Sequence, residues 1–196
     1  MSDQPAIPTA VARNFTLTLG EQHPAVEEAA RSLLDARVVA ALQSEPHEAW
    51  LPIAAHMRYQ QHVYERLGGE AFRRVWRRSM GRTFELPILA TLLDAATRLF
   101  GAGPLALTKI SMRAWVVASR NAGRVELEPV HEPGSAVLRL LDFPPLLFES
   151  RAFFEGFAGC YEAFYDVCGA DGTLHIVDFD PETRSARFVL RWNDES

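Results

Sequence analysis

Apolar residues recur every three or four positions along much of the first half of the chain, a spacing that places them on one face of an α-helix. Glycine residues interrupt this pattern at points typical of helix ends. Gly68 and Gly69 end one such helix, and Gly81 closes the next. We therefore predict four helices, over residues 24–42, 47–67, 70–80 and 88–100.

Three other segments have a different pattern. Residues 1–12, with two prolines and few apolar side chains, predict a flexible leader. Residues 14–19 (NFTLTL) alternate apolar and polar side chains, which predicts a short strand. Residues 105–120 favour a helix, although the strand propensity of the Trp115-Val116-Val117 run leaves a strand open as the alternative.

After Gly123 the pattern changes to the alternation of strands. The sequence Glu132-Pro133-Gly134-Ser135 separates two of these runs and has the composition of a hairpin turn. Ser150 is placed to cap the N-terminus of a later helix. We predict strands over 124–131, 136–142, 173–179 and 186–192, and a helix over 150–168.

This order of elements predicts the fold class. The expected fold is α+β, in which N-terminal helices pack with a β-β-α-β-β antiparallel four-stranded sheet. The length of 196 residues suits a single domain. We therefore expect residues 13–196 to form a single α+β sensor-like domain.

Composition and charge narrow the function classes. Hydrophobic residues make up 48% of the chain, as in folded domains. The net charge is −5, from 20 basic and 25 acidic residues, and such a protein repels nucleic acid. The sequence has neither an apolar run long enough to span a membrane nor a secretory signal. We expect a cytoplasmic protein.

Four arginines, Arg73, Arg74, Arg77 and Arg78, surround Trp76 in the sequence. Guanidinium groups can bind a carboxylate or a phosphate through two hydrogen bonds. A solvated helix face is nevertheless the favoured interpretation of this run.

Reactive side chains do not form a recognised catalytic or metal-binding motif in the sequence. It contains neither a Gly-x-Ser-x-Gly elbow nor a phosphate-binding loop. Cys160 and Cys168 lie about 12 Å apart along one predicted helix, too far for a disulfide. His56 and His62 point about 240° apart around another helix and cannot chelate together. We therefore predict no catalytic residue, metal or cofactor, and favour a binding protein over an enzyme.

The helix predicted over 150–168 carries the most informative pattern. Its small residues Gly156, Cys160 and Ala163 follow one another at i, i+4 and i+7, which suits an interface with another helix or with a second copy of the chain. Its aromatic stripe either belongs to an ordinary core or walls an apolar pocket. The pocket interpretation predicts five ligand-binding residues: Trp115, Phe153, Phe157, Tyr161 and Phe164.

Several short motifs resemble known families: Glu65-Arg66-Leu67-Gly68, Gly81-Arg82, Asp142-Phe143-Pro144-Pro145 and Phe154-Glu155-Gly156-Phe157. Together they resemble a myxobacterial paralogous family of uncharacterised proteins. Residues 154–192 are similar to the end of the 4-vinyl reductase domain, a ligand-binding module related in fold to heme-nitric-oxide-binding domains and TRAPP tethering subunits. The resemblance implies a ligand-binding or interaction module that is often dimeric. The Tyr-x-Ser-x-Arg triplet that holds heme propionates in the heme-binding relatives is missing from the sequence.

These observations favour a non-catalytic sensory or scaffold module. Its expected partners are a small apolar molecule and a second copy of the chain or another protein. Two alternatives stay open: a small enzyme with dispersed catalytic residues, and a heme-based gas sensor that uses one histidine.

Overall fold

A computed structural model describes residues 4–43, 49–101, 103–128 and 132–193. Its N-terminal half is mainly helical, with two short strands that pair antiparallel. In chain order the elements are β1 (Ala6–Pro8), α1 (Thr9–Gln22), α2 (Pro24–Arg31), α3 (Ala36–Gln43), β2 (Trp50–Pro52), α4 (Ile53–Leu67), α5 (Gly69–Phe84), α6 (Pro87–Phe100) and α7 (Pro104–Ala118).

The C-terminal half contains a four-stranded antiparallel sheet in the order β3-β4-β6-β5. The prediction of an α+β fold with a β-β-α-β-β sheet is confirmed, and the hairpin turn at Gly134 adopts a φ of 69°, which favours glycine. The short helix α8 was not predicted. The elements are β3 (Arg124–Leu127), β4 (Ser135–Leu141), α8 (Pro145–Phe148), α9 (Arg151–Cys168), β5 (Gly172–Asp180) and β6 (Ser185–Trp192).

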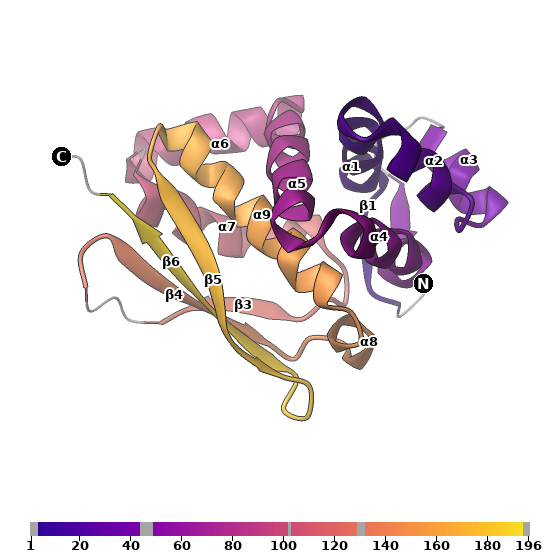
Figure 1. Cartoon of the computed structure of the whole chain (residues 1–196). Helices are drawn as coiled ribbons and strands as arrows, with labels where there is room; N and C mark the ends of the chain where they lie inside the picture. Colours follow the sequence, from indigo (N-terminus) through magenta and orange to yellow (C-terminus); the bar gives the residue numbers. More distant parts are fainter. Residues whose placement is uncertain (1–3, 44–48, 102, 129–131, 194–196) are drawn as a thin grey trace.

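The long helix α9 lies between the sheet and the other helices (Figure 1). It contacts both β5 and α5, and α5 in turn contacts α1. Buried side chains alternate along β6, where Ala186, Phe188, Leu190 and Trp192 face the core. One apolar core therefore joins the sheet to α9, and a second cluster, around Phe15 and Trp76, joins α1, α4 and α5.

The predicted strand over residues 14–19 is wrong, because these residues belong to α1. Phe15 and Leu19, four positions apart, are both fully buried in the described structure, so helical spacing and not alternation matches the core. The predicted leader over 1–12 is also wrong from residue 6 onward. Ala6 begins β1, and α1 starts at Thr9; residues 1–3 lie outside the described residues.

Several helix ends also differ from the prediction. The helix expected over 24–42 is broken into α2 and α3, and the Asp35 carboxylate accepts a 2.7 Å hydrogen bond from the Arg37 amide where α3 begins. The helix end predicted at Gly81 is absent. Helix α5 continues through Gly81 to Phe84, because a helical glycine costs only about 1 kcal/mol relative to alanine. The helix that was favoured for residues 105–120 is confirmed as α7.

Helix α4 begins at Ile53, later than predicted, after β2. Its buried face includes His56 and Tyr59, whereas His62 is half-buried. Part of the strand predicted over 124–131 lies outside the described residues, and β3 ends at Leu127.

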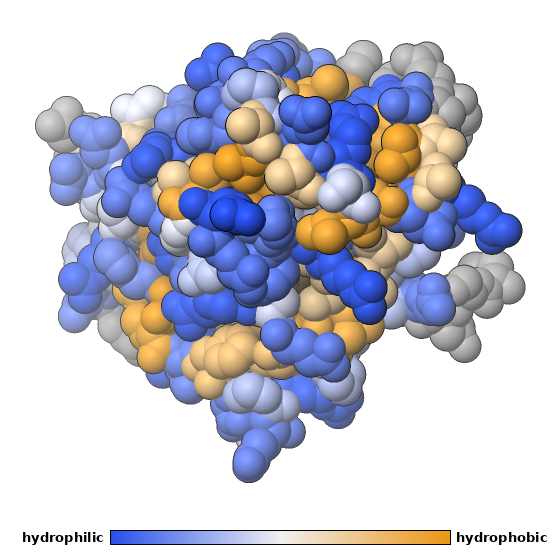
Figure 2. All heavy atoms as spheres, turned by 45° about the vertical axis from the view of Figure 1, so that its right-hand side comes forward, coloured by the Kyte–Doolittle hydropathy of each residue, from blue (hydrophilic) through white to orange (hydrophobic). Residues whose placement is uncertain are grey.

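The face that carries the N-terminal helices is mixed in character. Apolar residues there are interspersed with hydrophilic ones (Figure 2). Leu17 and Leu33 are the large apolar side chains of the described N-terminal helical region that are about half exposed. Within the described part of the chain, none of the helices is long and apolar enough to cross a membrane.

Candidate functional site

An apolar cavity of about 120 Å³ lies where α5, α7 and α9 meet the first residues of the chain. It is comparable with the roughly 150 Å³ engineered cavity that binds benzene or xenon. It is smaller than the roughly 300–1,000 Å³ of pockets for drug-sized ligands. Its lining consists of Ile7, Val11, Ile53, Gln60, Trp76, Met80, Ser111, Ala114, Trp115, Ala118, Phe153, Gly156, Phe157, Cys160, Tyr161 and Phe164.

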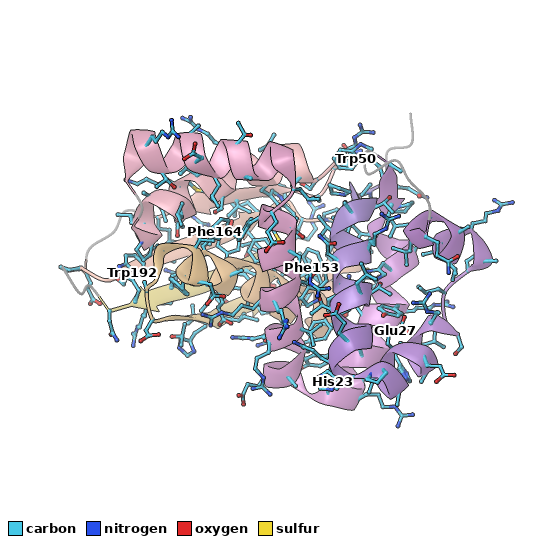
Figure 3. All side chains as sticks on the ribbon, turned by 90° about the horizontal axis from the view of Figure 1, so that it is seen from above. His23, Glu27, Trp50, Phe153, Phe164 and Trp192 are labelled. Atoms are coloured by element: carbon cyan, nitrogen blue, oxygen red, sulfur yellow. The ribbon has the colours of Figure 1, made fainter. Side chains whose placement is uncertain are left out.

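All five residues that the sequence predicted for a pocket line this cavity. Phe157 lies at the centre of the aromatic group, with ring centroids 5.4 Å from Trp115 and 4.7 Å from Tyr161. In Figure 3, the labelled Phe153 lies toward the N-terminal helices and Phe164 lies farther from them, so the stripe of α9 follows the length of the site. That these residues bind a ligand stays a prediction.

The opposite wall was missed by the sequence reasoning. Ile7 comes from β1 and Ile53 from the start of α4. Two backbone hydrogen bonds between Ala6 and Arg120, of 3.0 and 2.9 Å, hold β1 against the end of α7. Pairing over such a distance in sequence has no local signal, and a three-residue strand is too short for a periodic pattern.

Trp76 was not among the residues that the sequence predicted for the pocket, yet it lines the cavity. Its side chain is 5% exposed and stacks on Phe15 at 4.3 Å between centroids. A Cβ added at Gly156 would lie 2.7 Å from Trp76 Nε1, and one at Gly159 would lie 2.6 Å from the Arg73 carbonyl oxygen. The two glycines therefore allow α5 to approach α9 closely.

This packing agrees with the first of the two alternatives for Gly156, Cys160 and Ala163, an interface with another helix of the same chain. Gly156 and Ala163 are buried within the chain, and Cys160 is half-buried beside the cavity. The small residues thus pack inside one chain, and Gly156 faces α5. A surface for a second copy would have to be formed by other residues.

The arginines next to Trp76 are engaged in ion pairs between helices. Arg73 pairs with Glu155 and donates a 2.7 Å hydrogen bond to the Leu174 carbonyl oxygen. Arg77 binds both carboxylate oxygens of Asp166, at 2.8 and 2.6 Å. Burial raises the pKa of Glu162, which Arg73 also contacts at 3.5 Å. These residues form a charged seam between α5 and α9, and two of the four predicted cations are therefore neutralised by α9.

Burial shifts the pKa of two titratable groups beside the cavity, His56 and Cys160. Burial lowers the pKa of His56 to about 4, and its Nδ1 lies 2.8 Å from the Gln60 amide nitrogen. Burial also raises the pKa of the Cys160 thiol to about 12. Neither group is therefore charged at neutral pH.

The residues that could hold a metal are dispersed. Within the described ranges, no group of three or more His, Cys, Asp or Glu side chains comes close enough to hold a metal ion. His56 is buried beside Phe15 and Tyr59, with ring centroids 6.0 and 4.9 Å away. His175 is exposed on β5 and contacts Thr173.

No known protein-family model matches the chain, and no curated protein matches its sequence. Solved structures do match its fold. The unliganded Fe(II) H-NOX protein of K. algicida has a TM-score of 0.65 and 7% identity, covering 96% of this chain and 98% of that one. An oxygen-binding H-NOX domain related to soluble guanylate cyclases has a TM-score of 0.57 and 13% identity, with 96% of both chains covered. The chain therefore has the heme-nitric-oxide-binding fold.

Heme does not fit the residues that line the cavity. The described lining contains no histidine to ligate iron, and no arginine or lysine to pair with propionates. Cysteine and tyrosine can ligate heme iron as anions. Burial raises the pKa of both Cys160 and Tyr161, so iron would have to displace a proton from either group in order to bind it. The volume of about 120 Å³ is also small for a porphyrin.

Proposed function

We propose that this protein is a non-catalytic sensory module that binds a small apolar molecule, without heme, in the cavity between α5, α7 and α9. The observation that carries the proposal is the cavity itself, whose lining is almost entirely apolar. Core packing normally leaves few voids larger than a water molecule. An apolar space of this size is suited to a ligand of about the size of benzene.

The position of the cavity supports a sensory role. Its walls come from β1 and α1 on one side and from α7 and α9 on the other. A ligand that fills it contacts both halves of the chain and so favours the arrangement in which they are packed together. Binding would thereby alter the position of the N-terminal helices relative to the sheet.

Benzene binding tests this proposal. We expect benzene to shift the NMR signals of Phe157 and Tyr161, and Ala114→Leu to weaken its binding by more than tenfold because the larger side chain occupies the cavity. Arg113→Leu is the matched control, since Arg113 is exposed on the same helix and lies outside the cavity lining. Absence of benzene binding in the wild-type protein, or full binding by Ala114→Leu, would refute the proposal.

A heme-based gas sensor is the second candidate, and the shared fold with H-NOX proteins favours it. Titration with hemin separates the two. A binding protein without heme gives no stoichiometric Soret band, whereas a band that disappears in Ala114→Leu would establish heme as the occupant.

Three finer features are part of the proposal and derive from the sequence. They are membership of the myxobacterial family, a cytoplasmic location, and assembly as a homodimer or with a partner protein. Light scattering of the purified chain tests the homodimer directly.

A further inference from the structure

Two hydrogen-bond donors of the cavity lining have no partner among the described residues: Nε1 of Trp76 and the hydroxyl of Tyr161. Both side chains are 5% exposed. Leaving a buried donor unpaired costs about 1–3 kcal/mol, and the large majority of buried polar side-chain atoms are paired. Both donors belong to residues that line the cavity, so an acceptor bound there would pair them.

The indole of Trp76 is held in its orientation. One side of the ring stacks on Phe15, and Phe72 contacts it edge-on at 6.5 Å between centroids. Its Nε1 lies over Gly156, where a Cβ would be only 2.7 Å away. Because the ring is packed between these residues, Trp76 cannot turn its N–H toward another acceptor without opening the contact between α5 and α9.

Tyr161 is oriented in a similar way. Its ring packs between Phe157 and Phe164, at 4.7 and 5.8 Å between centroids. Burial raises its pKa, and the neighbouring Ser111 opposes that rise only in part. The Ser111 hydroxyl donates to the Thr108 carbonyl oxygen at 2.7 Å and makes no well-formed hydrogen bond with Tyr161. The phenol therefore stays protonated and can donate at neutral pH.

The charge of the lining restricts the ligand further. An indole N–H can only donate, and the described lining contains no Asp, Glu, Lys, Arg or His. Burying an unpaired charge there would be very costly. Resting on the proposed function, we infer that the ligand is a small uncharged molecule with an apolar body and one acceptor, such as a ketone or ether oxygen, to which Trp76 and Tyr161 donate.

A pair of probes of equal shape tests this inference. Cyclopentanone and methylenecyclopentane have the same number of non-hydrogen atoms as benzene and differ only in C=O against C=CH₂. We expect Tyr161→Phe to weaken cyclopentanone binding roughly three- to tenfold, the range of one lost hydrogen bond, and to leave methylenecyclopentane binding unchanged. Dissociation constants come from NMR titration of the full chain.

Tyr59→Phe is the matched control. The Tyr59 hydroxyl is also buried without a described partner, but Tyr59 is outside the cavity lining. This variant should bind both probes as the wild-type protein does.

The indole signals provide a second measurement that needs no variant. The chain has 4 tryptophans, so the Nε1–H signal of Trp76 can be assigned. It should move downfield with cyclopentanone and far less with methylenecyclopentane. If both probes bind but Tyr161→Phe affects them equally and the Trp76 signal responds alike, the acceptor inference is wrong and the cavity proposal stands. If neither probe binds, both are wrong.

Discussion

Polar groups are paired in the charged seam between α5 and α9. In the aromatic interior beside the seam, some polar groups have no described partner. In the seam, Arg73 and Arg77 each have carboxylate partners on α9. In the interior, Trp76 and Tyr161 keep donors without partners among the described residues. The seam therefore serves to hold two helices together, whereas the interior retains hydrogen-bonding capacity that a ligand can use.

The largest effect is expected from breaking the seam at Arg73. Arg73→Met leaves Glu155, whose side chain is 9% exposed, with Arg151 as its remaining described partner. We expect a loss of about 3 kcal/mol in the free energy of unfolding, the low end for a buried ion pair that loses one member, because Arg151 still pairs with Glu155. Urea denaturation at neutral pH measures it.

Two controls sharpen that experiment. Arg74→Met removes an exposed pair with Glu70 and should change stability by less than about 1 kcal/mol. The double variant Arg73→Met with Glu155→Met should be more stable than Arg73→Met alone, because the buried Glu155 carboxylate is then no longer left with Arg151 as its one remaining described partner. Equal losses in Arg73→Met and Arg74→Met would show that the seam contributes no more than surface ion pairs.

In the interior, His56 should make the protein sensitive to acid. Its pKa is about 4 in the folded chain against 6.5 as the ordinary value, so the unfolded state binds the proton first. The contribution of His56 to the free energy of unfolding is fully present above pH 6.5. It falls by roughly 2 to 3 kcal/mol as the pH drops toward 4.

His56→Phe should reduce the loss of stability between pH 7 and pH 4, and urea denaturation across that range measures the change. His175→Gln, at an exposed histidine on β5, should keep the wild-type dependence. A His56→Phe variant with the same dependence as the wild-type protein would show that His56 is not the responsible group.

A smaller effect is expected where the two regions meet. Gly159→Ala places a Cβ 2.6 Å from the Arg73 carbonyl oxygen, a backbone atom, and should cost about 1 to 3 kcal/mol because α5 must move away. Gly81→Ala is the control, since nothing lies within 4 Å of its Cβ position in α5. It should raise stability by about 0.5 to 1 kcal/mol. Thermal unfolding compares them, and a neutral Gly159→Ala would show that the helices can separate freely.

Much of the fold was predictable because its signals are local. The alternating run of β6 and the turn at Gly134 identify strands and a hairpin without any knowledge of their neighbours. The strand predicted for residues 14–19 fails for the opposite reason. The six residues of this segment match both the alternation of a strand and the spacing of a helix. Only the contacts of Phe15 with Trp76 and His56 show which side chains are buried.

The sequence alone determined the antiparallel sheet and the aromatic face of α9 from Phe153 to Phe164, because both are periodic within single elements. Tertiary structure decided what faces them. Ile7 and Trp76 reach the cavity through strand pairing and helix crossing between distant segments. Whether a buried donor such as Trp76 Nε1 finds a partner likewise depends on the surrounding packing, which linear spacing does not encode.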